Sequence, residues 1–132
     1  GAEFESLNGL SVLLVDDDLM IRKLSAMLVK NLGAQVVVAV DGEDALEQLK
    51  KHDFQLVITD IMMPKLDGVG LTRALRAGHF DGVILGCSAA TVGDELDSLL
   101  AAGADAVIPK PLTSKGLLTV LSSYPELSPD RH

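Results

Sequence analysis

The stretch that decides the fold is residues 10–18, which read LSVLLVDDD. A nearly continuous aliphatic run of this length is typical of a strand that is buried on both faces of a parallel sheet, and here it ends in three acids. A second run, residues 54–59 (FQLVIT), also ends in an acid, Asp60. Because ligands of open parallel sheets bind at the carboxyl ends of the strands, these acids indicate a polar site at one edge of the sheet.

Two later strands are also expected to end in reactive side chains. Residues 83–87 are apolar and precede Ser88, and residues 106–109 precede Lys110. A site that gathers several carboxylates, a hydroxyl and one amine suits a hard cation and a phosphoryl group.

Close approach of Asp60 to Asp16 and Asp17 would create a conflict of like charges, which a divalent cation resolves. All-oxygen ligands beside a phosphate favour Mg²⁺. The simpler interpretation is that acids at this position only cap the following helix. We prefer that interpretation for Asp18 alone, because capping does not explain Lys110.

The segments between the strands carry apolar residues at helical spacing, which predicts five strand–helix units. The fourth helix is expected to begin at a capping box over residues 91–94, and residues 34–40 are expected to form the second strand. Short connections between such units predict a doubly wound parallel α/β sheet. The first helix is expected to face the core through Ile21, Leu24, Leu28 and Leu32.

Length and composition indicate one domain with an aliphatic core. The chain has 132 residues, of which 48% are hydrophobic and 3% aromatic. We expect residues 1–8 to be a cloning remnant or linker, residues 9–123 the domain, and residues 124–132 a C-terminal tail.

Charge and cysteine content restrict the function classes. A net charge of −8 argues against nucleic-acid binding, which requires Lys and Arg to neutralise phosphates. No apolar run approaches the roughly 20 residues of a membrane helix, so no direct membrane insertion is expected. The single cysteine, Cys87, is expected to be a buried thiol in a reducing compartment, and the chain is expected to be cytoplasmic.

Four motifs in this order resemble the receiver domain (response regulator domain) of two-component phosphorelay signalling, over nearly the whole chain. They are the acid pair at 16–17, residues 60–64 (DIMMP) with 67–68 (DG), residues 88–89 (SA) and residues 110–111 (KP). The resemblance implies a flavodoxin-like fold with strand order 2-1-3-4-5. It also implies a signalling phosphoacceptor, not an enzyme with a substrate of its own, in which Asp60 takes a phosphoryl group from a phosphohistidine.

The same resemblance implies roles for individual residues around the metal. Asp17 and Asp60 would coordinate Mg²⁺ directly together with the backbone carbonyl of Met62, and Asp16 would act through water.

The resemblance also implies how the phosphoryl group is held and sensed. Lys110 would pair with Asp60 and then with a phosphoryl oxygen, and the bond to Pro111 would be cis. Ser88 would report the arrival of the phosphoryl group. Val107 stands where the family often has Tyr or Phe, so a rotating aromatic switch is not expected.

The partner implied is a histidine kinase or a histidine phosphotransfer domain. The departure at Val107 favours a relaying receiver of the kind joined to hybrid histidine kinases, while the oligomeric state is open.

Three other functions could be considered for these residues. A haloacid dehalogenase-like Mg²⁺-dependent phosphatase would use Asp16 and Asp18, but it generally needs a longer chain and further acids where Lys110 stands. A flavin binder would need a phosphate loop and stacking aromatics. A degenerate, phosphorylation-independent receiver is disfavoured by the intact set of acids, serine and lysine.

Overall fold

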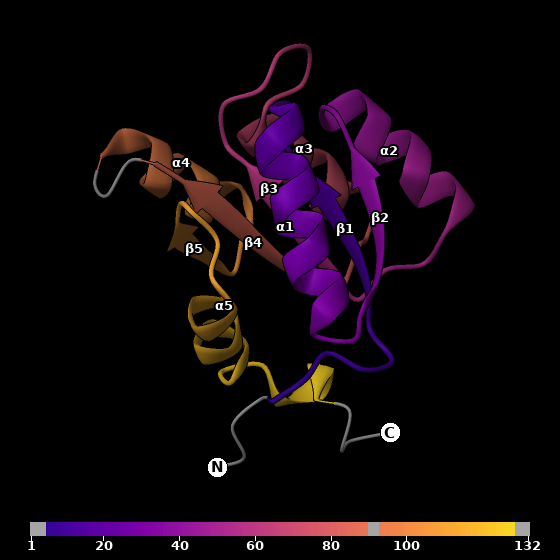
Figure 1. Cartoon of the computed structure of the whole chain (residues 1–132). Coiled ribbons are helices and arrows are strands. Elements are labelled where there is room, and N and C mark those ends of the chain that lie inside the picture. Colours follow the sequence, from indigo (N-terminus) through magenta and orange to yellow (C-terminus); the bar gives the residue numbers. More distant parts are fainter. Residues whose placement is uncertain (1–4, 90–92, 129–132) are drawn as a thin grey trace.

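The fold is a five-stranded parallel sheet with helices on both faces (Figure 1). It is described here from a computed structural model that covers residues 5–89 and 93–128. The strand order is β2-β1-β3-β4-β5, which confirms the expected flavodoxin-like topology. The strands are β1 (Ser11–Val15), β2 (Gln35–Ala39), β3 (Leu56–Asp60), β4 (Val83–Ser88) and β5 (Ala106–Pro109). The helices are α1 (Leu19–Asn31), α2 (Gly42–Lys51), α3 (Gly68–Ala77), α4 (Asp94–Ala102) and α5 (Ser114–Leu121), followed by the 3-10 helix η1 (Pro125–Leu127).

Alternating residues of the strands enter two separate cores, as a sheet covered on both faces requires. One core joins Val12 and Leu14 of β1 to α1 and α5. The other joins Leu13 and Val15 of the same strand to α2, α3 and α4. Because all the strands pair in parallel, their carboxyl ends lie at one edge of the sheet, and the site forms there.

The face of α1 that packs on the sheet differs from the expected one. Ala26 and Val29 are its buried residues. Leu28 lies half-buried beside them, whereas Leu24 is 61% exposed and Ile21 is 36% exposed. The prediction holds for Leu28 and Leu32, which pack against the core, and was wrong for Leu24, because Ala26 and Val29 form the buried part of the contact face.

Side-chain caps start most of the helices. Asp18 caps α1 by accepting a hydrogen bond from the backbone N–H of Ile21 at 3.0 Å, as preferred from the sequence. The helix α4 instead begins after Gly93, which has a φ of 129° and provides no side-chain cap. The expected capping box therefore does not supply this start within the described residues, and its first residue, Thr91, lies outside them.

Residues from both expected terminal segments pack in the α1–α5 core. Leu7 is fully buried and Leu127 is 4% exposed, and both belong to that core cluster. The boundaries at 9 and 123 stay a prediction. Within the described residues, no helix has both the length and the apolar character needed to cross a membrane.

Candidate functional site

Lys110 holds two carboxylates together at the carboxyl edge of the sheet. Its Nζ atom lies 3.1 Å from Oδ1 of Asp60 and 3.2 Å from Oδ2 of Asp16. These residues follow β5, end β3 and follow β1, so three separate strands converge on one ammonium group. The lysine side chain is 17% exposed, which distinguishes it from an ordinary solvated surface lysine.

The acids form a group that could hold a metal ion. Oxygen atoms of Asp16, Asp17 and Asp60 lie within 4.8 Å of one another. Asp16 is buried, Asp60 is partly buried and Asp17 is exposed, so the group opens to solvent on the Asp17 side. Hard divalent cations prefer carboxylate oxygens, and Mg²⁺ usually keeps several water ligands, so an open acidic group of this kind fits it.

The electrostatics of the site favour a bound cation. The pKa of Asp60 is raised, chiefly by burial, with the nearby charge of Asp16 adding to the effect and Lys110 opposing it. Burial lowers the pKa of Lys110, but the hydrogen bond to Asp60 and the two carboxylate charges outweigh burial and raise it. The metal-free site therefore carries a carboxylate that one lysine does not fully compensate.

Local hydrogen bonds fix the acids in place. The backbone N–H of Asp18 donates to Oδ1 of Asp16 at 2.9 Å, and the N–H of Ile61 donates to Oδ1 of Asp60 at 2.8 Å. Arg22 of α1 donates from its guanidinium to the backbone carbonyl of Asp16 at 2.9 Å. The sequence reasoning missed Arg22, because an arginine six residues after an acid gives no signal of a backbone contact.

The loop after β3 passes close behind Asp60 and needs a glycine to do so. A Cβ atom at Gly68 would lie 2.4 Å from the backbone carbonyl oxygen of Asp60, and the N–H of Gly68 donates to the carbonyl of Ile61 at 2.8 Å. Met62 lies on this loop with 65% of its surface exposed. Met62 therefore presents a solvent-exposed side chain two residues after Asp60.

Ser88 and Lys110 are joined through the backbone. The N–H of Lys110 donates to the carbonyl of Ser88 at 2.8 Å, and Ser88 pairs with Pro109 across β4 and β5. Ser88 is buried, and the Lys110–Pro111 peptide bond is cis. Every residue assigned to the site from sequence therefore lies at the same edge of the sheet.

Val107 lies beside a tight contact between β4 and α4. A Cβ atom at Gly86 would lie only 2.0 Å from Cδ2 of Leu99 and 3.6 Å from Cγ2 of Val107. Leu99 of α4 is fully buried and thus occupies the volume above Gly86. Nothing in the sequence singled out this contact, which ties α4 to the strand that carries Ser88.

Cys87 is buried next to Asp60 in the sheet and carries a free thiol. Burial raises the pKa of its thiol to about 11, with the positive charge of Lys110 opposing the shift. A thiol with so high a pKa is scarcely ionised near neutrality and is therefore inert.

The fold is a doubly wound α/β domain, and its site at the strand ends consists of acids in contact with one lysine. The family model "Response regulator receiver domain" matches residues 12–122. The chain belongs to this receiver domain family of signalling proteins. The phosphatase and degenerate-receiver alternatives are not favoured, and Asp18, which the phosphatase would use as an acid, caps α1.

The curated relatives are longer signalling proteins. Sensor histidine kinase RcsC of Salmonella typhi is 34% identical over 122 residues, which are 92% of this chain and 13% of that protein. Transcriptional regulatory protein CpxR of Escherichia coli is 39% identical over 109 residues, which are 81% of this chain and 45% of that protein. The chain thus spans less than half the length of either relative.

Solved structures with the same fold include chemotaxis proteins. Response regulator CheY4 of Vibrio cholerae has a TM-score of 0.78 and 29% identity, covering 86% of this chain and 97% of that one. A CheX–CheY complex with BeF3 and Mg from Borrelia burgdorferi has a TM-score of 0.80 and 28% identity, covering 89% of this chain and 90% of that one.

Proposed function

We propose that Asp60 accepts a phosphoryl group from a phosphohistidine on a histidine kinase or a histidine phosphotransfer domain. The observation that carries this proposal is the Lys110 ammonium group shared between Asp60 and Asp16 at 3.1 and 3.2 Å, within a group of three acids. A carboxylate, a cation site and a fixed amine are the parts that phosphoryl transfer to an aspartate needs.

Mg²⁺ is the cofactor that the donor set fits. We assign Asp17, Asp60 and the backbone carbonyl of Met62 as direct ligands and Asp16 as a ligand through water. The metal, when bound, would neutralise the acids and the phosphoryl oxygens, which is why transfer should depend on it. The Borrelia burgdorferi CheY, solved with BeF3 and Mg in its complex, supports this assignment by likeness.

In the proposed transfer, a carboxylate oxygen of Asp60 attacks the phosphorus atom and the bond from phosphorus to the histidine nitrogen breaks. The electron pair of that bond returns to the imidazole, and the product is an aspartyl phosphate. Lys110 would release the carboxylate and follow the charge onto a phosphoryl oxygen. Later attack of water on the phosphorus would restore Asp60 and release phosphate.

An exposed apolar stripe on α1 supports a protein donor. Met20 is 63% exposed, Leu24 is 61% exposed and Met27 is 59% exposed, and these residues follow one another at helical spacing. Met62, on the loop beside Asp60, is also exposed. The donor protein is proposed to cover this stripe with an apolar helical face while its phosphohistidine reaches Asp60.

The acceptor role is tested by intact mass after treatment with acetyl phosphate and Mg²⁺. The wild type is expected to gain one phosphoryl group, and Asp60→Ala or excess chelator should abolish the gain. Asp97→Ala, which removes an exposed acid of α4, is the matched control and should behave as the wild type. Modification that persists in Asp60→Ala would reject the proposal.

The donor surface is tested separately with Leu24→Asp. This variant should react with acetyl phosphate like the wild type, yet accept phosphoryl groups at least tenfold more slowly from the best donor in a panel of phosphorylated histidine phosphotransfer domains. Leu100→Asp changes a leucine of α4 that is 45% exposed and serves as the control. Equal transfer rates for both variants would show that the donor protein does not bind the α1 stripe.

The proposed switch works without an aromatic rotamer. Val107 is β-branched, has a stiff χ1 angle and has no hydroxyl group, so a signal from Ser88 must travel through the backbone and α4. Beryllofluoride with Mg²⁺ should therefore shift the NMR signals of Ser88 and Ala89 strongly and those of Val107 weakly. No change at Ser88 would show that its hydroxyl does not report phosphorylation.

A further inference from the structure

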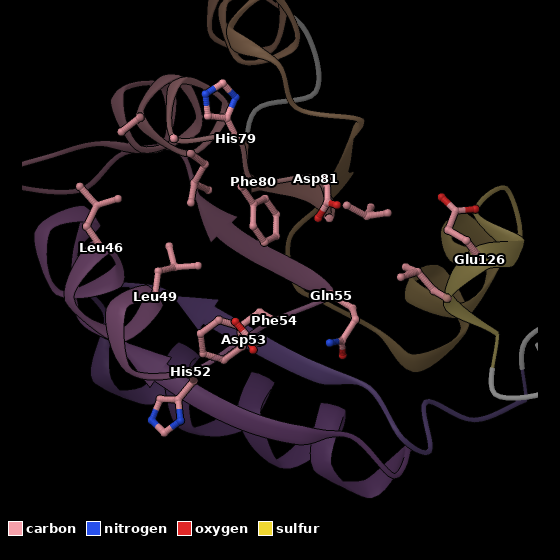
Figure 2. A pocket seen from close by; sticks show the side chains of 16 residues that line it. Leu46, Leu49, His52, Asp53, Phe54, Gln55, His79, Phe80, Asp81 and Glu126 are labelled. Carbon is pink, nitrogen blue, oxygen red and sulfur yellow. The ribbon is translucent and has the colours of Figure 1, made fainter. Parts of the chain in front are cut away.

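A cavity of about 630 Å³ lies at the end of the sheet opposite to Asp60. Its walls come from the carboxyl ends of α2 and α3, the segments that lead into β3 and β4, and η1 (Figure 2). The volume is within the range of roughly 300–1,000 Å³ that small-molecule sites occupy. None of the residues proposed to bind the phosphoryl group or the metal lines it, so it is a separate site.

The cavity has a mixed lining, in which aliphatic and aromatic side chains alternate with polar ones. Leu49, Phe54, Leu75 and Phe80 contribute to it, and Phe54 and Leu75 are themselves buried. Figure 2 shows Leu49, Phe54 and Phe80 turned towards the same space. An alkyl or aryl body would find contacts there, and aromatic faces also attract cations.

The charge around the cavity is negative. Asp53, Asp81 and Glu126 lie on its rim, and none of the described residues that line it is a lysine or an arginine. Two helices end at the cavity, and a helix carries partial negative charge at its carboxyl end. Arg76 lies nearby, but Asp105 pairs with its guanidinium at 2.9 Å and so balances its charge.

We propose that this cavity binds a small organic cation with an apolar body, such as an alkylammonium or arylammonium ion. The aliphatic and aromatic side chains of the lining account for the body of such a ligand, and the three carboxylates with the two helix ends account for its charge. An anion of the same shape would be repelled by the three rim carboxylates, although Arg76 over the Phe80 ring and the lysines that end α2 lie close by. His52 and His79 also line the cavity, and an imidazole nitrogen can accept a hydrogen bond that an ammonium group donates.

The test is a titration of the whole chain with three probes of matched shape, followed by amide NMR shifts. The probes are phenethylammonium, its neutral alcohol analogue and the phenylacetate anion, all at the same pH and ionic strength. The cation is expected to shift the signals of Gln55, Phe80 and Glu126 with the lowest Kd. The alcohol should bind several-fold more weakly, and phenylacetate should not shift these signals.

Charge-removing variants separate this site from general attraction to an acidic protein. Each of Asp53→Asn, Asp81→Asn and Glu126→Gln should weaken cation binding about threefold, as expected for one exposed charge at roughly 5–6 Å in water. Glu95→Gln removes an exposed acid of α4 that does not line the cavity and should leave the Kd unchanged.

Two outcomes would overturn the proposal. One is that the three probes bind alike or shift none of these signals. The other is that the triple variant, with an otherwise unchanged amide spectrum, binds the cation as tightly as the wild type does.

Discussion

Replacement of Lys110 by methionine removes the only described ammonium group that contacts Asp60 and Asp16 and keeps most of the side-chain volume. In the metal-free protein, two largely buried carboxylates would then face each other without the ammonium group that compensates their charge, although backbone N–H groups still donate to both. In the metal-bound protein, the cation itself would compensate them. We therefore expect a variant whose stability depends on Mg²⁺ far more than that of the wild type.

The loss of stability in Lys110→Met can be estimated from the contacts that Lys110 makes. Lys110 makes two charge-assisted contacts at 3.1 and 3.2 Å, and loss of one partner from a largely buried ionic group costs about 3 kcal/mol. For a domain of this size that loss lowers the Tm by about 10 °C. Removing one positive charge at roughly 6 Å from a divalent ion in water should tighten Mg²⁺ binding about tenfold.

The raised pKa of Asp60 also determines how the stability of Lys110→Met changes with pH. Burial raises the pKa of Asp60 above its unfolded value, so folding favours the protonated carboxyl group. The stability associated with this group is present at low pH and is lost as pH rises through its folded pKa. The deficit of Lys110→Met in chelator should therefore shrink as the pH is lowered from 7 towards about 5.

The assay is urea denaturation of both proteins in chelator and in saturating Mg²⁺, with Mg²⁺ affinity from a separate titration. Lys50→Met is the matched control, because Lys50 forms an exposed pair with Glu47 and should change stability by less than about 0.5 kcal/mol. Equal stability of Lys110→Met and the wild type in chelator, or weaker Mg²⁺ binding by the variant, would refute the reasoning.

Three further predictions concern the frame around the site. Gly86→Ala should overpack the contact with Leu99 and cost about 1–3 kcal/mol in urea denaturation, and the cost should be smaller in a Leu99→Ala background. Cys87 should resist a thiol reagent at about pH 8 until urea unfolds the chain, because burial raises its pKa. Arg76→Lys should cost about 2–4 kcal/mol, because a lysine cannot make the forked contacts to three backbone carbonyls and Asp105.

The sheet and the site were largely predictable because both depend on local sequence. An aliphatic run that ends in an acid specifies a buried strand and places its acid at the carboxyl edge. Parallel strands then bring Asp16, Asp60 and Lys110 together without any knowledge of their distances.

The face of α1 was not predictable, because hydrophobic spacing shows that a helix has an apolar side and not what covers it. Ala26 and Val29 contact the sheet, while Leu24 on a neighbouring face remains exposed. Of the predicted stripe, Leu28 and Leu32 pack against the core, whereas Ile21 and Leu24 are exposed to solvent.

Contacts between segments that are far apart in the chain could not be predicted from the sequence either. Nothing local relates Gly86 to Leu99, or Arg76 to the carbonyl of Gly103. The cavity at the far end of the sheet was missed for the same reason, since its lining residues are spread from α2 to η1.

Asp60 is proposed to carry the phosphoryl group, and the most direct test is to locate that group on the chain. After treatment with acetyl phosphate and Mg²⁺, borohydride reduces an aspartyl phosphate to homoserine, and peptide sequencing by mass spectrometry finds the altered position. We expect homoserine at position 60 alone. Homoserine at position 16 or 17, or none in protein that has gained the phosphoryl mass, would contradict it.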